Sequence, residues 1–140
     1  MKILGIEHVG VAVEGLEDPA RVFHELLGIS RGTTEEVPDR QVITESFDTG
    51  VGKVELLKAV SGSSPITRFL QKKGPGLHHI AFLVDDIQAW LDYLKEQGVG
   101  LVDEQPREGA GGCLTAFIHP RSTAGILLEL CQRPRPSSTS

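Results

Sequence analysis

Apolar and polar residues alternate with a period of two along much of the chain, which is the pattern of strands with one buried face. The clear segments are residues 6–13, 41–47, 53–59, 79–84, 114–119 and 126–131. Alternation is less complete at residues 29–36 and 99–102, where we expect a weak strand and a short one. The pattern therefore predicts about eight strands.

Two other segments have a helical period. We expect one helix to begin at Asp18, a good N-cap residue, and to end at Gly28. We expect a second helix to follow Asp85 or Asp86 and to end at Gly98. Their apolar stripes are Val22, Phe23, Leu26 and Leu27 in the first and Ile87, Trp90, Leu91 and Leu94 in the second.

The same order of elements occurs twice. The segments GIEHVGVAV (residues 5–13) and GLHHIAFLV (residues 76–84) match when His79 is aligned with His8, and a helix and three strands follow each. The sequence thus predicts an α+β fold with two tandem βαβββ modules in one domain. The modules are residues 4–60 and 77–132 of a domain 1–132, the linker 61–76 contains a short helix after Ser64, and the Pro- and Ser-rich tail 133–140 is expected to be disordered.

Composition narrows the range of partners. The 140 residues suffice for one domain with a buried core. The net charge of -5 argues against nucleic acid, which attracts clustered Lys and Arg. No apolar run is long enough to span a membrane or resembles a signal peptide, so we expect a cytoplasmic protein without membrane contact. Cys113 and Cys131 lack metal-ligand spacing and are expected to be reduced thiols.

Two histidines and two glutamates follow the repeat. His8 and His79 lie on the first strand of each module, and Glu55 and Glu129 lie on the last. Each Glu interrupts an apolar run, where a carboxylate in a dry core is costly, so we expect both to face a cavity. Two imidazoles and two carboxylates suit one divalent transition metal, although any one of them alone is more often a packed or solvated side chain.

The remaining histidines receive no site role. His78 is adjacent to His79, so strict alternation predicts that it points to the opposite face and is structural. His24 and His119 are expected to be exposed, although His119 could line the mouth of a pocket.

Several segments together resemble the vicinal oxygen chelate superfamily, which contains glyoxalase I and the extradiol dioxygenases. The segments are EHVGVAV (7–13), VELL (54–57), SPI (64–66), GLHHIAF (76–82), GAGG (109–112), HPRST (119–123) and LLEL (127–130). The combination of GLHHIAF, GAGG and HPRST with LLEL is most similar to the methylmalonyl-CoA epimerases of that superfamily. The resemblance covers most of the chain, residues 4–132.

The resemblance implies a glyoxalase-like fold, in which a curved mixed sheet surrounds a metal bound by His8, Glu55, His79 and Glu129. It implies a divalent ion, Co²⁺ in the first place and otherwise Ni²⁺, Mn²⁺ or Zn²⁺, and a homodimer. The implied reaction inverts C2 of an acyl-CoA substrate, methylmalonyl-CoA, by proton abstraction and reprotonation through an enolate.

Inversion needs a base on each face of the planar intermediate. Glu129 is the first candidate by its match to the family, Glu55 is the second and Glu45 is a weaker one. In epimerases with Gln at the position of Glu55, an additional Glu on an earlier strand is the second base. The corresponding residue here is Thr44, with Glu45 next to it, and this departure leaves the second base open.

The CoA phosphates would need local cations, for which Lys72, Lys73, Arg107 and Arg121 are the candidates. The GAGG loop offers backbone N–H groups that could close over the acyl end, or is a glycine turn without a ligand. Rival functions are a glyoxalase I-like lactoylglutathione lyase with the same ligands, an extradiol dioxygenase, and a non-catalytic small-molecule-binding protein. The fourth ligand argues against the dioxygenase, and the complete ligand set argues against the binding protein.

Overall fold

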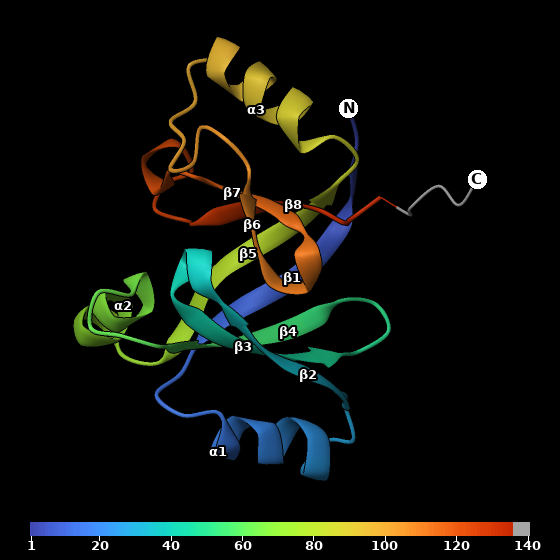
Figure 1. The fold of residues 1–140 in the computed structure, drawn as a ribbon, viewed down its shortest axis with the longest axis vertical. Coiled ribbons are helices and arrows are strands. Elements are labelled where there is room, and N and C mark those ends of the chain that lie inside the picture. Colours follow the sequence, from blue (N-terminus) through green and yellow to red (C-terminus); the bar gives the residue numbers. More distant parts are fainter. Residues whose placement is uncertain (136–140) are drawn as a thin grey trace.

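The computed structural model describes residues 1–135, and within them eight strands form one mixed sheet (Figure 1). The strands are β1 (Ile3–Ala12), β2 (Ser30–Val37), β3 (Val42–Asp48), β4 (Lys53–Ala59), β5 (Gly76–Val84), β6 (Arg107–Glu108), β7 (Leu114–Ile118) and β8 (Leu128–Gln132). The helices are α1 (Glu17–Ala20), which continues as a π-helical segment (Arg21–Leu26), α2 (Pro65–Lys73) and α3 (Ile87–Glu96). Short 3-10 turns cover Pro38–Arg40, Ala110–Gly112 and Pro120–Ser122.

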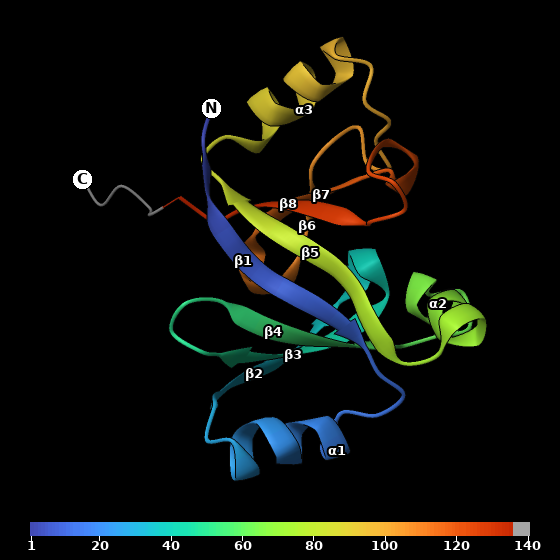
Figure 2. The same cartoon turned by 180° about the vertical axis from the view of Figure 1, so that it is seen from behind.

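The sheet has two equivalent halves. Its strand order is β2-β3-β4-β1-β5-β8-β7-β6, so β1 to β4 form one half and β5 to β8 form the other. The two first strands, β1 and β5, pair antiparallel at the centre, and each pairs in parallel with the last strand of its own half. Figure 2 shows β1 and β5 side by side through the middle of the molecule, with α1 and α3 at opposite ends. The predicted α+β fold with a curved mixed sheet is confirmed.

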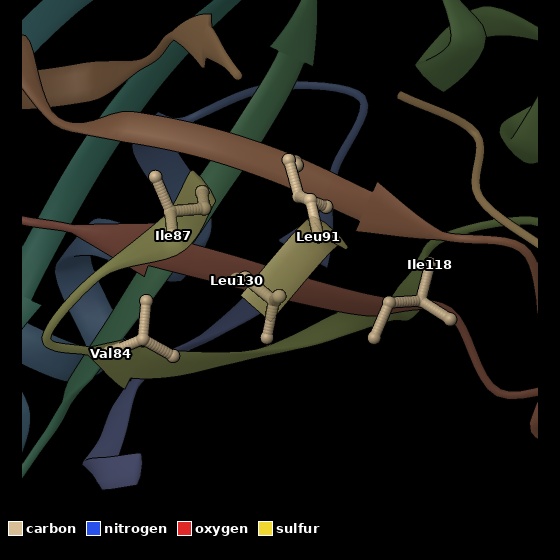
Figure 3. Close-up of a cluster of buried hydrophobic side chains, with 6 residues drawn as sticks. Val84, Ile87, Leu91, Ile118 and Leu130 are labelled. Atoms are coloured by element: carbon tan, nitrogen blue, oxygen red, sulfur yellow. The ribbon is translucent and has the colours of Figure 1, made fainter. Parts of the chain in front are cut away.

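Helix α3 closes the outer face of the second half (Figure 3). Ile87 and Leu91 of α3 pack with Val84, Ile118 and Leu130 from three strands, and each of the five is at most 7% exposed. Each Å² of apolar surface that is buried stabilises the folded state by roughly 25 cal/mol. This cluster therefore anchors β8, the strand that supplies one of the expected metal ligands.

The expected N-caps of α2 and α3 are present, whereas Asp18, the expected N-cap of the first helix, lies inside α1, because that helix begins at Glu17 after the N-cap position Leu16. Asp86 accepts a hydrogen bond from the backbone N of Ala89 at 3.1 Å, so it is the N-cap of α3. Ser64 likewise accepts from the backbone N of Ile66 at 3.2 Å and caps α2. Ile66 packs in a buried cluster with Leu57 of β4. The linker is therefore a packed part of the fold that contributes to one wall of the first half.

The first helix differs from its prediction. Phe23 packs against Phe47, with ring centroids 5.4 Å apart, but Val22, Leu26 and Leu27 are 42%, 58% and 64% exposed. Of the predicted apolar stripe, Phe23 alone packs against the buried cluster of this half. Leu27 donates a backbone hydrogen bond to Val22, five residues earlier, so this segment has the wider π-helical winding and departs from the 3.6-residue period on which the predicted stripe rests.

The structure also differs from the prediction at the edge of the sheet next to β7. Residues 99–102 form no strand but only an isolated bridge between Leu101 and Ile118, because Val99 and Leu101 pack into the core beneath α3. The two-residue β6 takes the edge position beside β7. Of the tail predicted to be disordered, residues 136–140 lie outside the described residues. Within residues 1–135 no helix is long and apolar enough to cross a bilayer.

Candidate metal centre and active site

A β-bulge in each central strand decides which side chains face inward. In β1 the extra residue is Glu7, directly before His8, and in β5 it is His78, directly before His79. A bulge re-aims the side chains of the strand that contains it, so strict alternation fails there. Glu7, His8, His78 and His79 consequently all line the same cavity. The prediction that His78 points to the opposite face is wrong for this reason.

Small residues lie opposite both inward histidines across the central strands. Across the central strands Gly10 is paired with His79, and Ala81 is paired with His8. A Cβ atom on Gly10 would lie 2.1 Å from Cε1 of His79, which is far inside van der Waals contact. The missing side chain at position 10 therefore allows the His79 ring to lie over β1, next to His8.

Three donor atoms meet at one point of the concave face. His8 Nε2 lies 3.0 Å from His79 Nε2 and 3.1 Å from Glu129 Oε1, and His79 Nε2 lies 3.3 Å from the same oxygen. All three side chains are buried. Neighbouring ligands at right angles around an ion with bonds of about 2.1 Å are about 3.0 Å apart. The spacing of these donors therefore fits one divalent ion.

Glu55 approaches the same point from the other half of the sheet. Its Oε1 lies 3.8 Å from His8 Nε2, farther than the oxygen of Glu129. β4, which contains Glu55, flanks β1, whereas β8, which contains Glu129, flanks β5. The two carboxylates thus reach the histidines from opposite sides. Nitrogen and carboxylate donors suit Co²⁺, Ni²⁺, Mn²⁺ and Zn²⁺, so the donor chemistry fits a transition metal.

Each inward histidine contacts the residue directly before it in the sequence. His8 Nδ1 donates to Glu7 Oε1 over 3.0 Å, and the Nδ1 atoms of His78 and His79 lie 2.8 Å apart. Phe117 of β7 packs edge-on to His79, with centroids 5.2 Å apart. In both histidines the Nδ1 side is therefore engaged by a neighbour, and the Nε2 side faces the shared point.

Hydrogen bonding and burial set the charges in the cluster. Burial alone would lower the pKa of His8, but the hydrogen bonds to Glu129 and Glu7 outweigh it and raise this pKa to about 10. Burial would raise the pKa of Glu129, but hydrogen bonds from His79 and His8 lower it to about 2. The hydrogen bond from His8 also lowers the pKa of Glu7. The cluster thus holds a positive charge between carboxylates, and a metal ion can take the place of that proton.

Burial shifts two further groups toward their neutral forms. It raises the pKa of the Glu55 carboxyl. Burial, together with the neighbouring His79, lowers the pKa of His78 to about 4. At neutral pH His78 is consequently an uncharged imidazole, which has a free lone pair on one ring nitrogen.

The donor cluster lies in a cavity of about 410 Å³ between the two halves. Val42, Leu57 and Ile66 supply an apolar wall from the first half and from α2. Arg40, at the end of the Pro38–Arg40 turn, donates to Asp103 of the second half over 3.0 Å. The two halves are therefore joined by an ion pair beside the cavity, which has room for a small organic group.

The structure does not bring Glu45 to this cavity. Its carboxylate is buried on the opposite face of β3, where Arg31 Nε donates to it over 2.5 Å. The preceding residue, Thr44, lines the cavity and lies diagonally across from Glu55 on β4. Period-two alternation of the strand separates residues 44 and 45 in this way.

Of the four cations expected near a CoA phosphate, Arg107 alone lines the cavity. Lys72 and Lys73 lie at the end of α2, and Arg121 lies beside Gly100. The GAGG loop contributes to the cavity wall, but the N–H of Gly111 donates to Glu35 of β2 over 2.9 Å. The prediction that this loop offers free backbone N–H groups therefore fails at Gly111.

Sequence analysis misses several residues of the cavity, namely Glu7, Arg40, Cys113 and Cys131. Both cysteines are free, as expected. Period two from Glu129 would have placed Cys131 on the cavity face. Glu7 is hidden by the bulge, and its only signal is that it matches His78 in the repeat.

Comparison with known families agrees with this fold. A family model described as the Glyoxalase/Bleomycin resistance protein/Dioxygenase superfamily matches residues 7–117. The chain therefore belongs to this superfamily, and the expected glyoxalase-like fold is confirmed.

Within the superfamily the chain is similar to methylmalonyl-CoA epimerases. The ethylmalonyl-CoA/methylmalonyl-CoA epimerase of Cereibacter sphaeroides is 37% identical over 129 residues, which cover 91% of this chain and 96% of the relative. An uncharacterized protein of Bacillus subtilis is 41% identical over 127 residues, 91% of either chain. The expected enzyme class, an isomerase of the epimerase type, is confirmed by these similarities.

Solved structures give the same result. The crystal structure of methylmalonyl-CoA epimerase from Mycobacterium tuberculosis has a TM-score of 0.91 at 32% identity and covers 95% of this chain and 90% of that one. A methylmalonyl-CoA epimerase in complex with methylmalonyl-CoA and NH4+ has a TM-score of 0.88 at 28% identity, with 94% and 96% covered.

Proposed function

We propose that the protein is a metal-dependent epimerase that inverts C2 of methylmalonyl-CoA. The observation that supports this function most directly is the convergence of His8, His79 and Glu129 on one point, with Glu55 approaching from the other half. Relatives named for this activity match nearly the whole chain, and one solved relative is in complex with methylmalonyl-CoA.

The four residues His8, His79, Glu129 and Glu55 would hold the ion, with Co²⁺ as our first choice and Ni²⁺, Mn²⁺ or Zn²⁺ as alternatives. Such an ion would polarise the thioester carbonyl and offset the negative charge that develops when the C2 proton leaves. The apolar wall of the cavity would exclude water and so protect the enolate from unspecific protonation.

Two carboxylates of the chain would transfer the protons. We assign Glu129 to one face of C2 and Glu55 to the other, because they reach the histidines from opposite halves of the sheet. Each carboxylate would swing off the ion while it transfers a proton: one takes the C2 proton, and the other, already protonated, gives its proton to the opposite face. The two residues then have exchanged protonation states, so the same pair serves the reverse reaction. Glu45 has no part in this assignment because it faces Arg31.

The second base would thus lie on a different strand from that implied by the resemblance. In the epimerases with Gln at position 55, the second base matches Thr44 on β3. Here a threonine stands at position 44 and a carboxylate at position 55, and both line the cavity on neighbouring strands. We infer that the carboxylate has moved by one strand while it still faces the substrate.

The rest of the substrate would extend out of the cavity. Arg107, which lines the cavity and is 44% exposed, is our candidate for a CoA phosphate. Lys72, Lys73 and Arg121 lie off the cavity and would serve only a more distant part of CoA. The homodimer and the cytoplasmic location stay predictions.

Proton exchange tests the proposal. Methylmalonyl-CoA is incubated with the protein in D2O and Co²⁺, and the C2 proton signal is followed by NMR before and after addition of a chelator. We expect rapid loss of the signal that stops when the metal is removed. Absence of exchange by protein shown to hold a divalent ion would refute the epimerase, and a glutathione hemithioacetal would be the next substrate to test.

A further inference from the structure

We propose that Glu7 and His78 are the positioning residues of the metal centre, each fixing the ring of the histidine that follows it, and that they make His8 and His79 unequal ligands. This inference rests on the proposed function, because it requires a divalent ion between the two histidines. It assigns a role to two residues that strict strand alternation places on the wrong face of the sheet.

The argument begins with the symmetry of the two contacts. Glu7 and His78 occupy the same place in the repeat, each is the extra residue of a β-bulge, and each lies against Nδ1 of the next residue. The contacts are 3.0 Å to His8 and 2.8 Å to His79. A bulge that recurs at both equivalent positions, with the same atom engaged each time, points to a common task.

The role of Glu7 and His78 follows from the position of the proton on the imidazole ring of the next residue. A neutral histidine that binds an ion through Nε2 has its one proton on Nδ1, and this N–H needs an acceptor when it is buried. The carboxylate of Glu7 is such an acceptor for His8. For His79 the acceptor is Nδ1 of His78, which places the proton of His78 on its Nε2. Phe69 of α2 packs perpendicular to the His78 ring at 5.0 Å and limits its rotation.

The two acceptors differ in charge. Glu7 also lies 3.8 Å from Lys53 and 3.4 Å from Arg133, and these cations favour its ionised form. An N–H that donates to a carboxylate makes the imidazole more basic at its other nitrogen than an N–H that donates to a neutral ring. His8 should consequently bind the ion more strongly than His79. The repeat places His8 and His79 at equivalent positions, but the preceding residues, Glu7 and His78, make them unequal as ligands.

Substitutions at positions 7 and 78 distinguish the effect of losing a hydrogen-bond acceptor from the effect of losing a negative charge. Asn at position 78 offers an oxygen close to the place of Nδ1, whereas Leu offers none. Gln at position 7 keeps an acceptor oxygen and removes the charge. We expect His78→Leu to weaken Co²⁺ binding about 10- to 100-fold and to shift the visible spectrum of bound Co²⁺. His78→Asn should bind Co²⁺ with an affinity within about threefold of that of the unaltered chain, and Glu7→Gln should lower this affinity about tenfold.

His24→Asn is the matched control, because His24 is an exposed histidine outside the cavity. Affinity is measured by competition with a coloured chelator, and thermal melting confirms that each variant is folded. If His78→Leu and Glu7→Gln bind Co²⁺ as tightly as the unaltered chain, with the same spectrum, the positioning roles are refuted. If the unaltered chain itself binds no divalent ion, the proposed function fails together with this inference.

A second test of these roles uses the unaltered chain. In the zinc-loaded protein with ¹⁵N-labelled histidine, long-range ¹H–¹⁵N spectra identify which ring nitrogen holds the proton. We expect protonated Nδ1 in His8 and His79 and protonated Nε2 in His78. A proton on Nδ1 of His78 would overturn its role as acceptor even when the metal binds and C2 exchange is fast.

Discussion

Single residues decide which side chains reach the point where the donor atoms of His8, His79 and Glu129 meet. The hydrogen atom that replaces a side chain at Gly10 gives the His79 ring its space. Thr44 and Glu45 are neighbours in sequence, yet one faces the cavity and the other faces Arg31. At this scale the chemistry of the site depends on the face of the strand on which a residue lies, and on its size.

Gly10→Ala tests the space for the ring. The added Cβ would lie 2.1 Å from the His79 ring, so His79 must move away from the donor point. We expect Co²⁺ affinity to fall about tenfold or more, measured by chelator competition. Gly62→Ala, where a Cβ meets no atom within 4 Å, is the control and should bind normally. Equal affinity of both variants would show that the ring does not need this space.

Moving the carboxylate from position 55 to position 44 tests the assignment of Glu55 as the second base. Glu55→Gln should lower the rate of C2 inversion by about 10²- to 10⁴-fold, because one face of C2 loses its proton donor and acceptor. Thr44→Glu in the same chain restores a carboxylate to the cavity on the neighbouring strand and should recover much of the rate. Inversion is measured by circular dichroism of the two substrate epimers, and Thr44→Gln in the Glu55→Gln background is the control. No recovery by the glutamate would contradict the proposed movement of the base.

Each helix makes a different contribution to the position of the site. Helix α3 is locked onto the sheet by buried side chains, and its cluster includes Leu130, the neighbour of Glu129. Helix α1, its π-helical continuation and the next residue leave the side chains of Val22, Leu26 and Leu27 exposed. The second half of the sheet therefore owes more of its stability to its helix than the first half does.

A pair of leucines measures this difference. Leu91→Ala removes a side chain that is 0% exposed, and it should lower the free energy of unfolding by about 2–5 kcal/mol. Leu27→Ala alters a side chain that is 64% exposed and should cost less than about 0.5 kcal/mol. Urea unfolding followed by circular dichroism gives both values. A large cost at Leu27 would mean that this surface is covered in solution.

At the scale of the whole molecule, the cavity combines charges from both halves of the sheet. His8 comes from the first half and Glu129 from the second, and their hydrogen bond opposes the desolvation of both. The stability of the metal-free protein should therefore depend on pH through groups that unfolding separates.

The direction of this pH dependence follows from the shifts. The pKa of His8 is raised from 6.5 to about 10, so its contribution is complete below pH 6.5 and is lost as pH rises to 10. The pKa of Glu129 is lowered from 4.5 to about 2, so its contribution is lost as pH falls through this range. The pKa of His78 is lowered from 6.5 to about 4, which also removes stability on the acid side. We expect the melting temperature in a chelator to be highest near pH 6.5.

Metal and substitution controls complete this measurement. Bound Co²⁺ would take the place of the His8 proton, so it should abolish the decline between pH 6.5 and 10. His8→Gln should abolish the same decline without metal. An alkaline decline that persists in His8→Gln would assign it to another group.

The amino-acid sequence by itself determined the repeat, most of the strands and the four candidate metal ligands, because hydrophobic period and residue type are local properties. His8, His79, Glu55 and Glu129 could be selected since each repeats at an equivalent place in an apolar strand. Only the tertiary structure decided the surroundings of these ligands. The bulges at Glu7 and His78 arise from the pairing of β1 with β5. Both depend on residues distant in sequence, and a shift by one residue reverses the face of every side chain that follows.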